Sequence, residues 1–524
     1  MTYAGALFAA CFTIISGNAL FAADTTRPTL SVLSPTSGQR VANTSSDVIV
    51  KGKARDNVHV SSVQVQLNGG VWLPAATTNG YTNWTATIAP QAATNRVRAY
   101  ATDSSGNFSA TNNLTFDFVV PSTLLLITNG LGGISRSFEG LELEVGRNYT
   151  VRAVPDAGQI FAGWDGSLVT TEPVLHFTMI ANMNLDAHFV PNPFPQALGR
   201  YNGLFAEPVR AHDHSGFFSL VLGTKGGYSA SLKRGTNVYS FSGKFNAAGL
   251  ANTNVSGMIV SMALDLATGE TITGSVSTGT WAANLLANRA AFNSLTNPAS
   301  QFQGKYTLII PGGADASVSP AGHGYGALTV GPSGYVTLNG GSADGRSLFQ
   351  NVGLSRNGDW AVYIPLYGGQ GSISGWLEFD TNQPITQING SLSCIRPPIS
   401  GATYYPLGFT NDAAALGSRY TAPGDALTRS INVTNGVVVF AGGNLSTTFT
   451  NSVRLTRTNT VINHSSNSLT ISINRTNGLF SGSVTVPGSG SSTAIRGALL
   501  QDMDAGFGYF LGTDQSGSVF FGQP

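Results

Sequence analysis

The stretch Val63-Gln64-Val65-Gln66-Leu67-Asn68-Gly69-Gly70 alternates apolar and polar side chains and ends in turn-forming residues. Alternation with a period of two places Val63, Val65 and Leu67 on one face of a β-strand. The Asn-Gly-Gly string favours a turn because these residues tolerate a left-handed backbone. Similar short runs closed by turn clusters recur from Leu30 onward at spacings of roughly 8 to 12 residues, which is typical of a β-sandwich or barrel.

Composition also favours β-structure. The chain has 524 residues, which suggests about three domains of ordinary size. Only 10% of the residues are charged, whereas 64 are glycine and 23 are proline, a balance that favours turn-dense strands over helices. With 27 basic and 26 acidic side chains the net charge is +1. We therefore expect no nucleic-acid partner, because no overall positive field would attract a polyanion.

The N-terminus predicts export. A mostly apolar stretch from Ala4 through Ile15 precedes the small residues Ala22 and Ala23, as in a secretory signal peptide over residues 1–23. The mature protein would then be extracellular or at the cell surface. No later segment offers the roughly 18 apolar residues of a membrane helix. After signal removal only Cys394 remains, which excludes an internal disulfide.

The first region after the signal resembles a known module. Its characteristic strings are Ala54-Arg55-Asp56-Asn57-Val58, Val63-Gln64-Val65, Trp84, Ala101-Thr102-Asp103 and Gly106-Asn107. Over about residues 25–120 they resemble the bacterial immunoglobulin-like (Ig-like) modules of secreted and cell-surface proteins. The resemblance implies an Ig-like β-sandwich, which we place at residues 24–120.

A second resemblance covers residues 122–190. Its strings are Leu143-Glu144-Val145-Gly146, Tyr149-Thr150-Val151, Ala157-Gly158, Phe161-Ala162-Gly163-Trp164-Asp165-Gly166, Phe177-Thr178-Met179 and Asn184-Leu185-Asp186-Ala187-His188-Phe189. They resemble the bacterial repeat domain related to internalin B-repeats (InlB B-repeats). The resemblance implies a small β-grasp-like domain at 121–191 that acts as a spacer or stalk unit. Trp164 follows a glycine that permits close backbone approach, so we expect this ring to fill the core.

Residues 196–524 repeat internally. Gly199-Arg200-Tyr201, Gly304-Lys305-Tyr306 and Gly417-Ser418-Arg419-Tyr420 each open a series of alternating strands and glycine turns. The spacing predicts units at about 199–303, 304–394 and 417–523, built from hairpins in series. Such hairpins lose their exposed edges by closing, so we expect a large antiparallel β-barrel or sandwich.

The C-terminal region is also similar to uncharacterised β-rich modules of large secreted bacterial proteins. The resembling strings are Tyr201-Asn202-Gly203-Leu204-Phe205 and Gly508-Tyr509-Phe510-Leu511-Gly512-Thr513. No activity follows from this resemblance. Within the region, Trp281 to Leu295 could form an amphipathic helix. We expect a strand instead, because Gly279-Thr280-Trp281 matches Gly358-Asp359-Trp360, which leads into strand-forming residues.

No catalytic motif with a local signature is present. No serine has a glycine two positions before and two positions after it, so the hydrolase nucleophile elbow is missing. The zinc-protease, phosphate-loop and EF-hand patterns are missing as well. The sequence therefore favours a non-enzymatic protein but leaves open a glycosidase, whose two carboxylates can lie far apart along the chain.

Metal ligands have two candidate sets. His212 and His214 flank Asp213 and would share one face of a strand, where two imidazoles could bind one ion, with His323 as a further ligand. Asp56 and Asp103 lie in loops at one end of the predicted sandwich, where carboxylate oxygens could bind calcium. The competing interpretation of both aspartates is capping of local turns. No other cofactor is expected.

Aromatic residues are close together in sequence near the middle of the C-terminal region. Tyr363, Tyr367 and Trp376 could form a platform on which sugar rings stack, with Tyr404 and Tyr405 nearby. The alternative is that these rings fill the core, as aromatic residues in alternating strands usually do.

Three functions remain open from sequence. The favoured one is a secreted or cell-surface structural or adhesive protein with spacer modules and a C-terminal interaction domain, whose partner is a polysaccharide or a cell-surface protein. The second is an extracellular carbohydrate-binding or carbohydrate-active protein. The third is an outer-membrane barrel, suggested by Tyr509-Phe510 and Phe520-Phe521.

Overall fold

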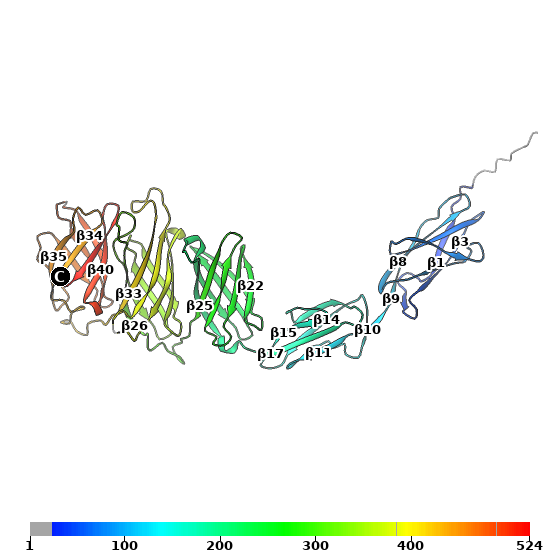
Figure 1. Cartoon of the computed structure of the whole chain (residues 1–524), viewed down its shortest axis with the longest axis horizontal. Coiled ribbons are helices and arrows are strands. Elements are labelled where there is room, and N and C mark those ends of the chain that lie inside the picture. Colours follow the sequence, from blue (N-terminus) through cyan, green and yellow to red (C-terminus); the bar gives the residue numbers. More distant parts are fainter. Residues whose placement is uncertain (1–23, 384, 489) are drawn as a thin grey trace, which may run out of the picture. The chain divides into compact units, whose positions relative to one another are not determined.

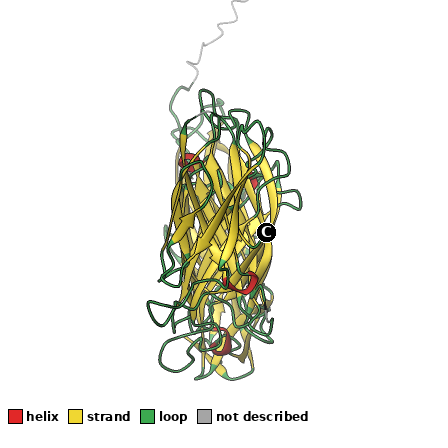
Figure 2. Cartoon of the chain, turned by 90° about the vertical axis from the view of Figure 1, so that its left-hand side faces the viewer, coloured by secondary structure: helices red, strands yellow, loops and turns green. Residues whose placement is uncertain are grey.

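A computed structural model describes residues 24–383, 385–488 and 490–524. The predicted signal peptide at 1–23 lies outside these residues. The described chain is all-β, and the only helical elements among the described residues are four short 3-10 turns, which Figure 2 shows in red between strands and loops. These turns are η1 (Pro195–Ala197), η2 (His212–His214), η3 (Tyr367–Gly369) and η4 (Gln501–Met503). The chain divides into two compact units, residues up to Val190 and from Pro191 onward.

The first domain of the N-terminal unit is a sandwich of two sheets. One sheet has the order β1 (Thr29–Ser34), β3 (Val48–Arg55), β7 (Trp84–Ile88) and β6 (Ala76–Thr77). The other has the order β2 (Arg40–Ala42), β9 (Asn112–Val119), β8 (Ala93–Asp103), β4 (Val60–Leu67) and β5 (Trp72–Pro74). The core between them includes Val63, Val65 and Trp84, whose side chain is only 1% exposed. Gly52 is required beside Trp84, since a Cβ there would collide with the indole ring.

The second domain of this unit has three small sheets. They are β10 (Pro121–Thr123) with β13 (Glu142–Glu144); β11 (Leu125–Asn129), β17 (Asn184–Pro191) and β15 (Gln159–Gly166); and β12 (Gly132–Ser135), β14 (Asn148–Pro155) and β16 (Val174–Thr178). Strands β11 and β17 pair in parallel, as the terminal strands of a β-grasp do. Residues 121–191 contain no helix, so the domain lacks the helix of a complete β-grasp. Trp164 fills the core, which confirms the sequence prediction.

The C-terminal unit contains three antiparallel eight-stranded sheets, which Figure 1 shows in green, yellow-green and orange to red. We call them the first, second and third barrels. The first barrel has the order β21 (Asn237–Lys244), β20 (Gly227–Arg234), β19 (Gly216–Leu222), β18 (Gly199–Ala206), β25 (Ala282–Arg289), β24 (Thr271–Ser277), β23 (Met258–Leu264), β22 (Leu250–Val255). Residues 282–289 therefore form a strand, as we expected, and not a helix.

The second and third barrels follow the same plan. The second has the order β29 (Ser347–Gly353), β28 (Tyr335–Gly341), β27 (Gly324–Val330), β26 (Gly304–Ile310), β33 (Phe409–Arg419), β32 (Ile388–Arg396), β31 (Gly371–Phe379), β30 (Asp359–Leu366). The third has the order β36 (Val461–Asn463), β35 (Phe449–Leu455), β34 (Asn435–Gly442), β41 (Ser516–Gly522), β40 (Ala505–Leu511), β39 (Ser492–Leu500), β38 (Leu479–Thr485), β37 (Leu469–Ile473).

In each barrel the first strand pairs with the last, and the two edge strands lie side by side without forming a ladder. The sheets are therefore nearly closed. Apolar side chains fill the interiors of the second and third barrels, such as Trp360 and Phe379 in the second and Phe440 in the third. The barrels also pack against each other through outer faces, the first on the second at Leu204 and Tyr363 and the second on the third at Ile309 and Leu500.

The structure corrects one predicted boundary. We expected the second unit to end near 394 and the third to begin at Gly417. Instead β33 (Phe409–Arg419) belongs to the second barrel, where Arg419 lies opposite Tyr306 of its first strand. The reason is closure, because the strand that completes a barrel must return to the first strand. Tyr420 comes directly after this strand, and its hydroxyl donates to Arg475 O of the third barrel at 2.8 Å.

Candidate functional site

Three carboxylates converge at one end of the Ig-like sandwich. Asp24 precedes β1, Asp56 follows β3, and Asp103 ends β8. One oxygen from each side chain lies within 4.8 Å of the others. The sequence predicted Asp56 and Asp103 but missed Asp24, because only the fold brings the start of the first strand to these two loops.

Hydrogen bonds fix the three side chains in place, and Asp24 Oδ1 accepts from the Thr26 N–H at 2.9 Å. Asp103 Oδ1 accepts from the backbone N–H groups of Ser105 and Asn107, both at 2.8 Å. Asn107 Nδ2 donates to Asp103 Oδ2 at 2.7 Å and to Asp24 O at 2.8 Å, which ties the N-terminal segment to the loop after β8. Asp56 Oδ2 accepts from the N–H of Val58 at 2.8 Å. The predicted turn capping is therefore present as well.

Two oxygens of the cluster remain unmatched. Asp24 Oδ2 and Asp56 Oδ1 are both buried, and neither has a hydrogen-bond partner among the described residues. Burial would raise the pKa of the Asp103 carboxyl, but hydrogen bonds from Asn107 and Ser105 outweigh it, so the pKa lies below its usual value. A buried charge without a partner is costly. A cation with oxygen ligands would satisfy these groups, and the loop position and carboxylate donors suit calcium.

The two histidines do not form a shared site. His212 and His214 lie on the short turn η2 instead of a strand, so positions two apart do not share a face. Both ring nitrogens of His212 are engaged, Nδ1 with Ser372 Oγ at 3.0 Å and Nε2 with Gly369 O at 2.8 Å. His214 Nδ1 lies 2.8 Å from Glu207 Oε2.

His214 and His323 have other surroundings. The ring of His214 stacks on Trp281 with centroids 5.0 Å apart. His323 lies between the second and third barrels, where its ring contacts Phe507 edge-on. Burial lowers the pKa of His323, which favours its neutral form. The structure thus distributes the three histidines over separate environments.

The three aromatic residues predicted to stack on sugars also separate. Tyr363 is buried between the first two barrels, and its hydroxyl accepts from the Gly235 N–H at 2.7 Å. Tyr367 lies at the end of the second barrel, where its ring contacts the guanidinium of Arg396 at 4.9 Å. Trp376 is partly exposed and lines a cleft together with Leu204 and Leu286 of the first barrel.

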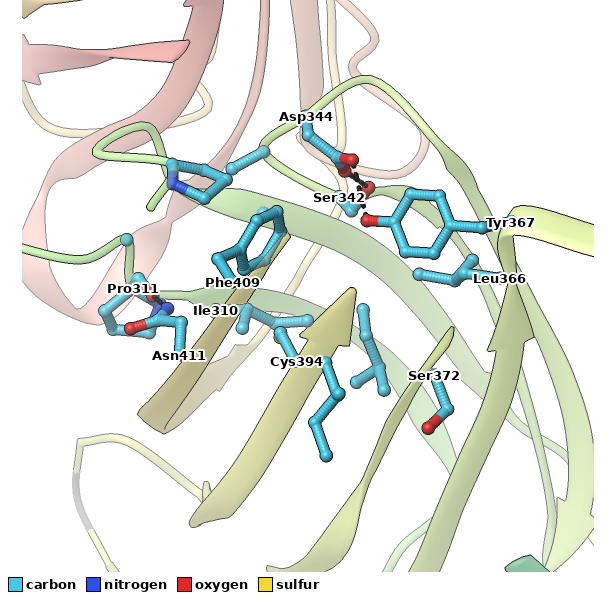
Figure 3. Close-up of a pocket in the computed structure, with 16 residues that line it drawn as sticks. Ile310, Pro311, Ser342, Asp344, Leu366, Tyr367, Ser372, Cys394, Phe409 and Asn411 are labelled. Atoms are coloured by element: carbon cyan, nitrogen blue, oxygen red, sulfur yellow. Dashed lines mark hydrogen bonds between the residues drawn. The ribbon is translucent and has the colours of Figure 1, made fainter. Parts of the chain in front are cut away.

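Tyr367 belongs to a polar cluster beside a small cavity, shown in Figure 3. Its hydroxyl donates to Asp344 Oδ2 at 2.7 Å, and Ser342 Oγ donates to Asp344 Oδ1 at 2.5 Å. Arg396 Nη1 lies 3.4 Å from Asp344 Oδ2, and the two side chains are 2% and 1% exposed. Arg396 Nε is buried and has no hydrogen-bond partner in the part of the chain that the structure describes. The cluster is therefore a buried ion pair supported by two hydroxyl groups.

The cavity itself offers little room for chemistry. It measures about 30 Å³, about enough for one water molecule. Cys394 lines it, and burial raises the pKa of this thiol to about 12. At neutral pH the thiol is protonated, and a protonated thiol is a poor nucleophile. The residues around this cavity therefore serve to pack the end of the second barrel.

Comparison with known families identifies the two N-terminal domains. Residues 28–99 match the bacterial Ig domain family, and residues 123–193 match the divergent InlB B-repeat domain family. The protein is thus a modular all-β protein with two domains that are typical of bacterial surface proteins. No curated protein matches the chain.

Several solved structures are distantly similar to the chain. The fibronectin(III)-like modules of Clostridium thermocellum CbhA are 12% identical, with 42% of this chain and 94% of that chain covered and a TM-score of 0.15. Transferrin binding protein B from Haemophilus parasuis is 10% identical over 82% of each chain, with a TM-score of 0.18. A 1.5-MDa bacterial ice-binding adhesin is 12% identical, with 63% and 97% covered and a TM-score of 0.15. Such low TM-scores support no functional argument.

Proposed function

We propose that the protein is a secreted or cell-surface adhesive protein, in which residues 24–191 act as spacer domains and the three barrels bind a surface partner. The observation that carries this proposal is the succession of a bacterial Ig domain and an InlB B-repeat ahead of the barrels. No helix in the described part of the chain is long and apolar enough to cross a membrane. Because apolar side chains fill the interior of the second barrel, a partner would bind to the outer surfaces of the barrels.

A retention assay tests the adhesive function. The full chain, immobilised on beads, is exposed to cell-wall fractions, extracellular polysaccharides and intact cells. We expect saturable retention of at least one of these. If the chain retains none of them and instead releases soluble sugar from a polysaccharide, the adhesive function is wrong. The carbohydrate-active alternative would then take its place. Export is tested separately by N-terminal sequencing of the mature protein, which we expect to begin at Asp24.

We further propose that Asp24, Asp56 and Asp103 bind one calcium ion that stiffens the first spacer domain. The supporting observation is the pair of buried, unmatched oxygens on Asp24 and Asp56. Three segments distant in sequence would be joined by one ion, which would hold the start of β1 against the loops after β3 and β8. Calorimetric titration of the metal-free full chain with calcium tests this proposal, and a binding stoichiometry of zero would refute it.

A further inference from the structure

A cleft lies between the first and second barrels. It measures about 190 Å³ and is bounded by β18 and β25 of the first barrel and by β31 of the second. Its walls combine the apolar side chains of Leu204, Leu286 and Trp376 with the polar groups of Arg210, Asn284 and Ser374. Mostly apolar walls with a few polar groups are the usual character of a small-ligand site, and domain junctions are a usual place for one.

Trp376 is an outward-facing residue that the barrel core does not use. Its neighbour Leu377 points into the core of the second barrel, so alternation directs Trp376 to the outer face. There the indole packs against the small cluster that contains Leu204 and Tyr363 and remains partly exposed. The face of an indole ring carries partial negative charge and attracts the C–H groups of a sugar ring.

The polar groups beside this ring suit hydroxyl groups. Arg210 Nη1 donates to Ser374 O at 2.9 Å and to Ser393 Oγ at 3.2 Å, which holds the guanidinium at the wall of the cleft. None of the ion pairs found in the described chain neutralises Arg210. Ser374 is buried, and its Oγ has no hydrogen-bond partner among the described residues. Asn284 is exposed at the opposite wall.

A second depression continues the cleft on the other side of Arg210. It measures about 420 Å³ and is lined by the hydroxyl groups of Ser391, Ser393 and Thr410 and by the carboxylate of Asp412. Ser393 Oγ donates to Asp412 Oδ1, so this carboxylate is held at the surface. Arg210 therefore lies between the cleft that contains Trp376 and the hydroxyl-rich depression. These two neighbouring spaces suit two consecutive units of a polymeric ligand that is rich in hydroxyl groups.

We infer that this cleft binds an oligosaccharide segment of a surface or extracellular polysaccharide, with one pyranose ring stacked on Trp376 and the next unit beyond Arg210. The inference rests on the proposed adhesive function and names the chemistry of its partner. The mixture of aromatic, amide and hydroxyl groups favours a sugar over an apolar peptide, whose side chains would leave the Ser374 hydroxyl without a partner.

Calorimetry on the full chain tests the inference with oligosaccharides of glucose, xylose, N-acetylglucosamine and galacturonic acid, the last of which reports on charge pairing with Arg210. We expect the oligosaccharides of one of these four sugars to bind to the full chain. Trp376→Ala should then raise the Kd by about tenfold or more, as loss of a buried tryptophan contact does at an interface. Asn284→Ala, at an exposed position, should raise it severalfold. Trp72→Ala, in the Ig domain, is the matched control and should leave the Kd unchanged.

The results separate this inference from the proposed function. Unaltered binding by both Trp376→Ala and Asn284→Ala would overturn the inference. Retention of the full chain on cell-wall fractions without affinity for any of the sugars would overturn it too, while the adhesive function would stand. Failure of both assays would reject both proposals. If Trp376→Ala does not fold, as judged by its melting curve, Asn284→Ala and Arg210→Lys decide the outcome.

Discussion

The end of the second barrel and the end of the Ig domain both bury carboxylates, yet they balance the charge differently. Asp344 has an internal cation, Arg396, and two hydroxyl donors. Asp24, Asp56 and Asp103 have backbone and amide donors but no arginine or lysine within ion-pair distance in the described chain. The first site has its cation within the chain, whereas the second would be completed by the calcium ion that we propose. The difference separates a structural ion pair from a candidate metal site.

The largest expected effect comes from breaking the complete pair. Arg396→Met leaves Asp344 charged and buried, and we expect this to destabilise the second barrel by about 3–5 kcal/mol. Thermal and urea unfolding of the full chain measure the loss. Arg356→Met, at a side chain that is 63% exposed, is the control and should change little. The double variant Arg396→Met with Asp344→Leu should recover most of the stability, and a double variant as unstable as the single one would contradict the pairing argument.

Calcium removal should have the next largest effect. At a calcium concentration of about 100 times the Kd, binding adds roughly 2.7 kcal/mol to the stability of the Ig domain, which chelation with EDTA removes. We expect the melting transition of this domain to fall on the order of 10 °C. Calorimetric scans of the full chain with calcium and with EDTA measure the shift.

Matched variants show whether this shift belongs to the carboxylate cluster. Asp56→Asn should abolish the calcium-dependent shift, because it removes one of the charges that face the ion. Asp47→Asn, an exposed carboxylate of the same domain, should retain the full shift. Equal shifts in both variants would place the calcium effect elsewhere in the protein.

Acidification should destabilise the Ig domain through the carboxyl group of Asp103. The pKa of Asp103 in the folded protein lies below its usual value, which is about 3.9 in an unfolded chain. Its contribution to stability is therefore complete above that value and is lost as the pH falls through the folded pKa. Unfolding without added calcium across this acid range should show a smaller pH slope for Asp103→Asn than for Asp47→Asn. Equal slopes would show that Asp103 does not carry the effect.

The smallest effect is expected from exposed ion pairs within the N-terminal unit. Glu144 pairs with Arg40 and lies 2.7 Å from Arg147, while Arg147 lies 3.1 Å from Asp117. The arginine side chains are 45% or more exposed, so we expect Glu144→Gln to change stability by about 0–1 kcal/mol. Urea unfolding in low and high salt measures this change. A loss as large as that of Arg396→Met would contradict the distinction between buried and exposed pairs.

Much of the architecture follows from local sequence. Alternation over Val63 to Leu67 predicts a strand with a buried face, and Trp164 is predicted to fill the core of its small domain; the structure confirms both. Asp56 and Asp103 could be predicted as a pair because each lies directly after or at the end of an alternating run. Asp24 could not be predicted as their partner, since no local pattern reports which strand ends meet in space.

The sequence by itself determined the strands, the two N-terminal domain types and the all-β character, because period-two alternation and turn residues act over a few positions. Only the tertiary structure decided three other features. Strand 409–419 closes the second barrel; Arg396 neutralises Asp344; and Trp376, unlike Tyr363, faces a cleft. Each of these depends on contacts between segments far apart along the chain, where closure and burial, not local propensity, select the partner.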